Sequence, residues 1–299
     1  MNSNKYIITT GWWCGPDSGV NNQRTKYGSE NIRTLGFFEK WYAAVNRFSN
    51  PVKILIVDSA SESLPSILFD KRLELISLDE NSGHSTSHIG KYAGVTRAHI
   101  CGMIYAMCCN VDYWVYIEQD ALIYGNGIVE YAISKLKNDI MFGDGHGTPQ
   151  PMQQSFMIMK TSAIPAFIYN FTKINKTDAE ISPEMKFWMA STGLSKSLPI
   201  DAYCDSTPKS IIFEIIRLYW KPTFDFRKIN KLAKSKNRFP IKSIKPIKNY
   251  ITDTYHGYDL LPFGYGRARP INFTDKYLYF QHGSFEELKC YDELFNKPL

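Results

Sequence analysis

The feature that most constrains the fold is the apolar run Tyr113–Ile117, which leads directly into Glu118-Gln119-Asp120. A continuous run of β-branched and aromatic residues is typical of a central strand that is buried on both faces. Unpaired carboxylates are costly to bury, so we expect both acids at the carboxyl end of the strand, where open α/β sheets bind ligands. Alternate residues of an extended chain point the same way, so both acids can face one cation. The alternative is an ordinary strand end with solvated acids.

The hydrophobic pattern around this run predicts an α/β protein. Strands are expected at residues 5–10, 52–57 and 73–78, with helices at about 32–48 and 89–109. This order is typical of a mostly parallel sheet with crossover helices. Further strands are expected at 139–142, 155–159 and 277–280, with helices beginning at about 161 and 183.

Composition indicates a globular protein in a reducing compartment. Hydrophobic residues make up 44% of the 299 residues and charged residues 21%, which is ordinary for a globular chain. The six cysteines form no CxxC pair, which disfavours a disulfide framework or a zinc site. The polar residues 1–6 do not resemble a signal peptide, and polar residues interrupt the most apolar window, 98–117. We therefore expect a cytoplasmic protein without a membrane span.

The positive charge is concentrated in residues 217–248, which carry eleven Lys and Arg against one acid. This segment is expected to be helical, and a solvated helix face is the simplest interpretation. Its interleaved Phe and Ile residues also suit a helix that lies on an anionic membrane surface, which would fit a lipid-linked substrate. The rest of the chain is net acidic and shows no nucleic-acid-reading module, so nucleic acid is disfavoured as a partner.

Short polar motifs follow the predicted elements in a recognisable order. They are Thr9-Thr10-Gly11, Asp58-Ser59, Asn81-Ser82-Gly83, Arg97 and Glu118-Gln119-Asp120. In this order they resemble the glycosyltransferases of the GT-A fold, over about the first 125 residues. The family's metal motif is Asp-x-Asp, so this chain departs conservatively at its first acid and keeps the second. The resemblance implies one continuous GT-A domain, in which residues 1–125 bind the nucleotide sugar and 126–299 bind the acceptor.

The resemblance also implies where a UDP- or GDP-sugar would bind. Asp58 would accept a hydrogen bond from the base or ribose, although a turn-forming Asp is the alternative. Thr10 and Gly11 would let the backbone approach the nucleotide, and Trp12 would stack on it or belong to the core. Asn81 and Gly83 belong to the same predicted site.

Basic residues are expected to meet the diphosphate of this donor. Arg97 is one candidate, and its alternative is a charge on a helix surface. Arg267 and Arg269 lie in a Gly-rich loop near His282 and are further candidates.

The same resemblance implies a metal site. Asp120 and His282 would hold Mn²⁺ or Mg²⁺, and the imidazole favours Mn²⁺. Glu118 would support the site through water or the sugar hydroxyls. The alternative for His282 is a surface histidine at a strand end.

An inverting transferase needs a base that deprotonates the acceptor hydroxyl. Glu184, in the first turn of a predicted helix, is the first candidate and Asp144 the second; a capping or loop acid is the alternative for each. A retaining mechanism stays open. The acceptor is expected to be a glycan or a lipid-linked molecule.

Two alternative functions stay open. One is a sugar nucleotidyltransferase, whose usual Gly-rich phosphate loop is missing here, and the other is a non-catalytic carbohydrate-binding protein on the same fold.

Overall fold

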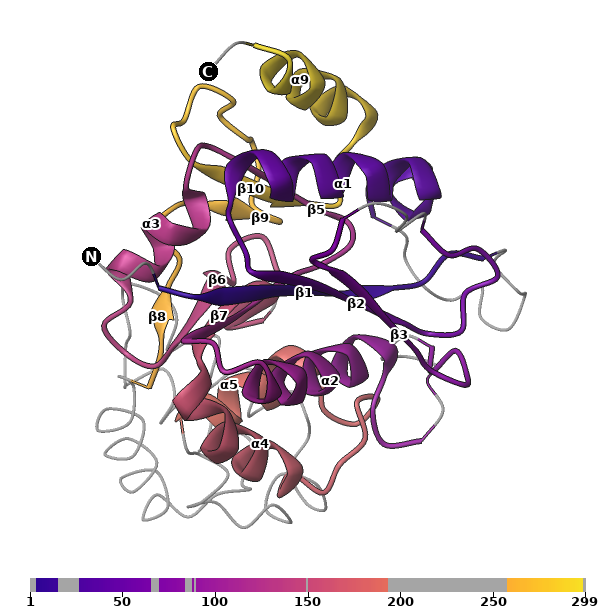
Figure 1. Cartoon of the computed structure of the whole chain (residues 1–299), viewed down its shortest axis with the longest axis vertical. Coiled ribbons are helices and arrows are strands. Elements are labelled where there is room, and N and C mark those ends of the chain that lie inside the picture. Colours follow the sequence, from indigo (N-terminus) through magenta and orange to yellow (C-terminus); the bar gives the residue numbers. More distant parts are fainter. Residues whose placement is uncertain are drawn as a thin grey trace, which may run out of the picture.

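A sheet of seven strands forms the centre of the molecule (Figure 1). The computed structural model describes residues 4–15, 27–65, 70–83, 88, 90–148, 150–192 and 257–297. The strand order is β3-β2-β1-β4-β7-β6-β8, and only β7 runs antiparallel to its neighbours. The strands are β1 Tyr6–Trp12, β2 Lys53–Asp58, β3 Leu73–Ser77, β4 Tyr113–Ile117, β6 Ile140–Asp144, β7 Met152–Lys160 and β8 Asp259–Leu260. The predicted mostly parallel α/β sheet is confirmed.

Helices cover both faces of this sheet, which explains why its central strands are buried almost throughout. Figure 1 shows α1 on one face, and α2, α4 and α5 on the other. Their bounds are α1 Leu35–Phe48, α2 Gly94–Cys108, α4 Ile164–Thr172 and α5 Pro183–Thr192. Successive strand residues point to opposite faces, so Ile8 packs in the core under α1 and Ile7 in the core under α2. Both isoleucines are fully buried.

A second, smaller sheet lies on the α1 side of the large sheet (Figure 1). It consists of β5 Ala121–Tyr124, β10 Leu278–Gln281 and β9 Tyr265–Gly266. Helices α3 (Ile128–Lys135) and α9 (Phe285–Phe295) pack with it. Strand β10 pairs antiparallel with β5, with Gln281 opposite Ala121. Because β5 directly follows the acids after β4, this pairing brings the end of β10 to Glu118 and Asp120.

Four helices differ from the sequence prediction. Helix α2 begins at Gly94, later than expected, and a short 3-10 helix, η1 (Glu30–Arg33), precedes α1. Helices α3 and α9 were not predicted at all. Helix α9 begins with a capping box in which Ser284 and Glu287 bond each other's backbone N–H groups. The basic segment 217–248 lies outside the described residues.

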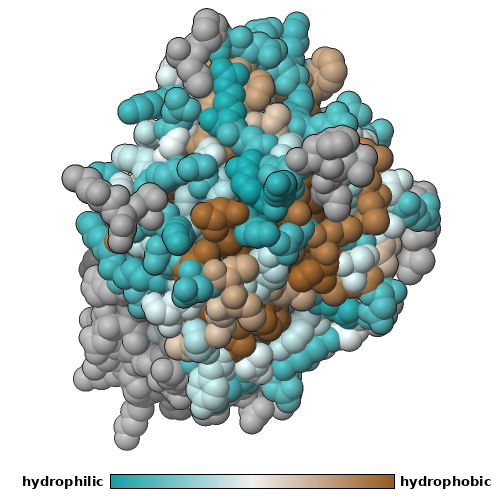
Figure 2. All heavy atoms as spheres, viewed as in Figure 1, coloured by the Kyte–Doolittle hydropathy of each residue, from teal (hydrophilic) through white to brown (hydrophobic). Residues whose placement is uncertain are grey.

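Hydrophilic side chains predominate on the face shown in Figure 2, with apolar side chains gathered near its middle. No helix among the described residues combines the length and hydrophobicity needed to cross a lipid bilayer.

Candidate active site

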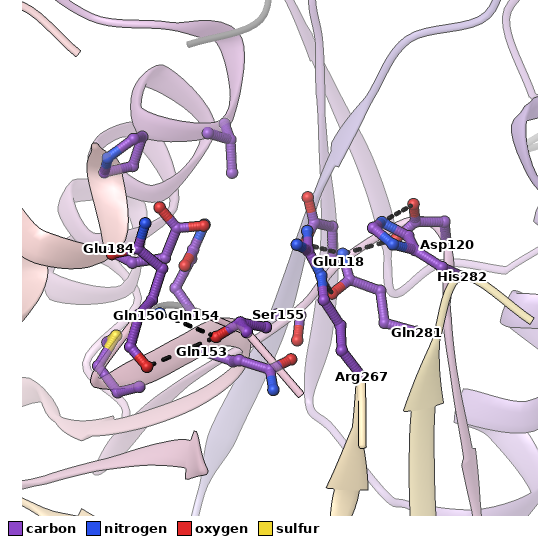
Figure 3. Close-up of a pocket in the computed structure, with 14 residues that line it drawn as sticks. Glu118, Asp120, Gln150, Gln153, Gln154, Ser155, Glu184, Arg267, Gln281 and His282 are labelled. Atoms are coloured by element: carbon purple, nitrogen blue, oxygen red, sulfur yellow. Dashed lines mark hydrogen bonds and ion pairs between the residues drawn. The ribbon is translucent and has the colours of Figure 1, made fainter. Parts of the chain in front are cut away.

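A cleft opens beside the carboxyl end of β4, and its two walls differ in chemistry (Figure 3). One wall carries Glu118, Asp120, Gln281, His282 and Arg267; the other carries Glu184 and residues of β7 and the loop before it. The cavity measures about 70 Å³. This volume holds only part of a nucleotide sugar, because whole-ligand pockets usually span about 300–1,000 Å³. The full lining is Val95, Glu118, Asp120, Thr148, Gln150, Met152, Gln153, Gln154, Ser155, Pro183, Glu184, Arg267, Gln281 and His282.

Asp120 is a buried acid of the cleft with two charged or ionisable neighbours. Its side chain is 7% exposed, and Oδ2 lies 3.2 Å from Nε2 of His282 and 3.7 Å from Nη2 of Arg33. Burial alone would raise the pKa of this carboxyl group. The neighbouring His282 ring and Arg33 guanidinium outweigh burial and lower the pKa of Asp120 to about 2. Asp120 is therefore a carboxylate at physiological pH.

His282 adopts a backbone conformation that non-glycine residues rarely use. Its φ angle is +58°, in the left-handed region, which costs on the order of 1–3 kcal/mol. Its ring stacks on Tyr27 with the ring centres 5.7 Å apart. Gly28 lies so close that an added Cβ would stand 2.7 Å from the carbonyl of His282. The segment before η1 thus packs tightly against His282 and fixes its ring beside Asp120.

Glu118 and Asp120 are joined by the side chain of Gln281. Nε2 of Gln281 donates to Glu118 Oε2 at 2.7 Å and to Asp120 Oδ1 at 3.1 Å. Between the two acids, Gln119 points elsewhere and forms hydrogen bonds with the backbone N–H and C=O of Trp13. The Glu-Gln-Asp order therefore places two acids in the cleft and uses the middle residue to tie the ends of β1 and β4 together.

The contact between Asp120 and His282 is an ion pair or hydrogen bond, and its length would also suit two ligands of one metal ion. Adjacent ligands of an octahedral ion with bonds of about 2.1 Å are separated by about 3 Å, close to the 3.2 Å between Oδ2 and Nε2. Within the part of the chain that the structure describes, no group of three or more His, Cys, Asp and Glu side chains could hold a metal ion. A cation would thus take its remaining ligands from water or from a bound phosphate.

The opposite wall presents Glu184 from the first turn of α5. This helix is anchored by a fully buried ion pair, in which Nζ of Lys186 lies 2.7 Å from Oδ1 of Asp178. The other oxygen of Asp178 accepts hydrogen bonds from Ala93 N–H and the Thr96 hydroxyl at the start of α2. The pair thus ties α5 to α2 and sets the position of Glu184.

Several polar atoms in the β7 wall are buried without a protein partner. Among the described residues, Gln150 Oε1, Gln153 Oε1 and Ser155 Oγ form no hydrogen bond. Buried polar groups are rarely left unsatisfied, so such atoms usually mark the place of ordered water or a polar ligand.

Arg267 reaches the cleft from the end of β9. Its Nε donates to Oε1 of Gln281 at 3.4 Å, and its guanidinium lies 5.8 Å from the centre of the Tyr27 ring. The structure therefore brings Arg267, Glu118, Asp120, His282 and Glu184 to one cleft, and their roles there stay predictions.

Two residues of the predicted nucleotide site are buried, which corrects the prediction. The Trp12 ring is 2% exposed, packs edge-on against Phe38 and donates to the carbonyl of Ser63, so it belongs to the core and is not available for stacking. Thr10 is fully buried. The space beside Gly11 is filled by Ala98, 2.9 Å from where its Cβ would stand, so this glycine serves the packing of β1 on α2.

Asp58 also has a structural role where a ligand contact was predicted. It is fully buried and accepts hydrogen bonds from Ser61 N–H and from the Ser77 hydroxyl at 2.8 Å, which is the turn-forming alternative. Asn81 and Gly83 form a turn closed by a 2.9 Å hydrogen bond between Asn81 Oδ1 and Gly83 N–H. They lie outside the cleft lining, so their contact with a nucleotide stays a prediction.

Three further candidates lie away from the cleft lining. Asp144 accepts from His146 N–H at 2.8 Å and faces a separate pocket, so it is poorly placed as the base. Arg269 forms an ion pair with Glu287 at 2.5 Å and donates to the carbonyl of Gln281, so it supports the wall from behind and is not a diphosphate clamp. Arg97 pairs with Glu80 at 2.9 Å, and its contact with a diphosphate stays a prediction.

Sequence reasoning missed Gln281 and Arg33. Gln281 directly precedes His282 at the end of a predicted strand, so the sequence did indicate that its side chain lies near the site. Arg33 lies in the short 3-10 helix before α1, and no pattern in the sequence indicates its contact with Asp120.

Comparisons with known proteins give a fold likeness only. No protein-family model matches the sequence, and no curated protein matches it. The solved glycosyltransferase GlyE of Streptococcus pneumoniae TIGR4 is similar with a TM-score of 0.44 and 12% identity, covering 99% of this chain and 61% of that structure's chain. The chain thus spans less than two thirds of that protein's length.

Two further solved structures are similar at the same low level. A putative glucose-1-phosphate thymidylyltransferase from Bacillus anthracis gives a TM-score of 0.37 at 8% identity, covering 99% of this chain and 96% of that one. A 4-diphosphocytidyl-2C-methyl-D-erythritol synthase from Anaerococcus prevotii DSM 20548 gives 0.36 at 11% identity, covering 62% and 81%. At these values the likeness says nothing about substrate.

Proposed function

We propose that this protein is a metal-dependent glycosyltransferase. It would move a sugar from a UDP- or GDP-sugar to a glycan or lipid-linked acceptor, with inversion. The observation that carries the proposal is the contact between Asp120 and His282, which are distant in sequence but lie 3.2 Å apart in a cleft that also holds Arg267 and Glu184.

The wall of Asp120 and His282 suits the diphosphate of the donor. Asp120 and His282 would hold Mn²⁺ or Mg²⁺, which neutralises the charge that builds on the diphosphate as the glycosidic bond breaks. Arg267 would donate to phosphate oxygens from the same wall, because its guanidinium matches the geometry of a phosphate. Glu118 lies beside Asp120, where it would orient the donor.

The opposite wall suits the acceptor. Glu184 would accept the proton of an acceptor hydroxyl, whose oxygen then bonds to the anomeric carbon as the bond between that carbon and the phosphate oxygen breaks. The nucleoside diphosphate leaves on the side of Arg267, and the sugar is transferred with inverted configuration. The division into a donor half, residues 1–125, and an acceptor half, residues 126–299, belongs to this proposal.

Binding of the donor tests the proposal directly. Isothermal titration of UDP- and GDP-sugars with and without Mn²⁺ should show tight binding only with the ion, and Asp120→Asn should abolish the Mn²⁺-dependent part while the protein stays folded. The variant Asp144→Asn is the matched control and should bind like the wild type. Undiminished Mn²⁺-dependent binding in Asp120→Asn would contradict the metal assignment, and release of pyrophosphate from a nucleoside triphosphate and a sugar 1-phosphate would favour the nucleotidyltransferase.

The role of Glu184 is tested separately. Glu184→Gln should leave donor affinity unchanged and lower kcat by about 10²–10⁴-fold, because an amide cannot take the proton. Equal losses of donor affinity and kcat would place Glu184 in donor binding, and an unchanged kcat would remove it from the reaction.

A further inference from the structure

The side chain of Gln281 holds a central position in the cleft that the proposed reaction leaves unexplained. It is 3% exposed and contacts three charged residues through its amide group. Its Nε2 donates to Glu118 and Asp120, and its Oε1 accepts from Arg267. The two carboxylates accept only and the guanidinium donates only, so the orientation of the amide is fixed by its partners.

This arrangement reduces the repulsion between two carboxylates that lie side by side. Like charges that share a site normally draw in a proton or a cation. The amide of Gln281 supplies one donor to each carboxylate without adding charge. Among the described residues, two guanidinium groups, Arg33 and Arg267, also stand at this wall opposite the two acids Glu118 and Asp120.

These two guanidinium groups and two carboxylates balance each other before any ligand arrives, and the His282 ring beside Asp120 adds no negative charge. A divalent cation alone would add two positive charges beside two guanidinium groups. A cation that arrives with a nucleoside diphosphate adds little net charge, because the phosphates carry compensating negative charge.

We propose that Gln281 is a positioning residue that makes cation binding depend on the diphosphate. Its neutral amide aligns Glu118 and Asp120 and holds Arg267 at the cleft, so that the site takes up a divalent cation together with a nucleoside diphosphate and only weakly by itself. This inference rests on the proposed donor site.

The backbone of Gln281 is held in place by strand pairing and by a hydrogen bond from a side chain. It pairs with Ala121 in the small sheet, and its carbonyl accepts a 2.9 Å hydrogen bond from Arg269. Arg269 is in turn held by Glu287 of α9. The amide therefore approaches the two acids from a rigid strand.

The test measures Mn²⁺ uptake by the decrease in the electron paramagnetic resonance signal of the free ion, without nucleotide and with UDP or GDP. Wild-type protein should bind Mn²⁺ weakly alone and much more tightly with a nucleotide. Gln281→Glu adds a third carboxylate and should bind Mn²⁺ alone about tenfold more tightly or better. Gln281→Met should weaken uptake in the presence of nucleotide by about 10–100-fold, the usual effect of losing a group that orients metal ligands.

The matched control is Lys289→Gln, which makes the same change in net charge on the exposed face of α9. It should bind Mn²⁺ like the wild type. The inference is overturned if Gln281→Glu binds Mn²⁺ no more tightly than Lys289→Gln, or if Gln281→Met retains wild-type uptake with nucleotide. Thermal unfolding shows whether a variant is misfolded. If Gln281→Met does not fold, the inference is judged from Gln281→Glu alone, because that change preserves the shape of the side chain.

Failure of the proposed function gives a different result. If neither UDP nor GDP increases Mn²⁺ uptake by the wild type, the donor assignment is wrong. The comparison of Gln281→Glu with Lys289→Gln needs no nucleotide, so it still judges the role of Gln281.

Discussion

The two walls of the cleft differ in where their charged residues lie. We call the wall with Asp120 and His282 the β10 wall, and the wall with Glu184 the α5 wall. On the β10 wall, Asp120 meets its partners His282 and Arg33 at the cleft itself. On the α5 wall, the charges that hold the structure, Lys186 and Asp178, are fully buried behind the cleft. If the proposed donor binds here, we expect the charged residues of the β10 wall to change partners and those of the α5 wall to stay in place.

The largest expected effect tests the rigidity of the α5 wall. Lys186→Met leaves the buried carboxylate of Asp178 without its counter-ion and should lower the free energy of unfolding by about 3–5 kcal/mol. Urea denaturation measures it. Lys160→Met breaks an exposed pair with Asp139, 2.9 Å long, and should cost at most about 1 kcal/mol. Equal losses in the two variants would remove the contrast between the walls.

A medium-sized effect on the free energy of unfolding is expected at the β10 wall, and it depends on pH. The pKa of Asp120 is lowered to about 2 in the folded protein, below its unfolded value of about 3.9. Its ionised form therefore stabilises the fold above pH 4, by about 2–3 kcal/mol, and this contribution is lost as the pH falls from 4 towards 2. The difference in unfolding free energy between wild type and Asp120→Asn, measured in EDTA, should shrink over that range. A difference that is constant with pH would contradict the ion pairing.

The smallest effect tests the support behind the β10 wall. Arg269→Lys keeps the charge but loses the planar donor group that joins Glu287 to the carbonyl of Gln281. We expect a loss of about 0.2–1 kcal/mol in stability, because the pair is partly exposed. Nucleoside diphosphate affinity should change less than twofold. A much larger loss of affinity would restore Arg269 as a diphosphate ligand.

The sequence was sufficient to predict six of the seven strands of the large sheet, because strands that are covered by helices are strongly apolar. Residues 54–57 of β2 and the whole of β4 are apolar without interruption, and their order along the chain fixes a parallel arrangement. The two-residue strand β8 was not predicted, and of the small sheet only β10 was, at 277–280, because β5 and β9 are short. Helix α9 did carry a readable signal, the capping box of Ser284 and Glu287.

The candidate site was predicted in part, and the errors share a cause. Asp120 and His282 were paired through a family resemblance, and the structure places them together. Arg269 was assigned to a ligand, and for Asp58 and Trp12 the ligand was one of two alternatives. Each has nearby protein partners that the sequence cannot reveal. A polar residue at a strand end serves equally well as a turn former, a core contact or a ligand until its neighbours are known.

The pairing of β10 with β5 has a consequence for the order of events during synthesis. Gln281 contacts Asp120 across 161 positions of the chain and Glu118 across 163. A nascent chain therefore carries both acids for the time needed to make all the residues between them, with no Gln281 and no His282 to meet them. The cleft cannot be completed until residue 282 has left the ribosome, so fragments released earlier contain the acids but lack the wall that organises them.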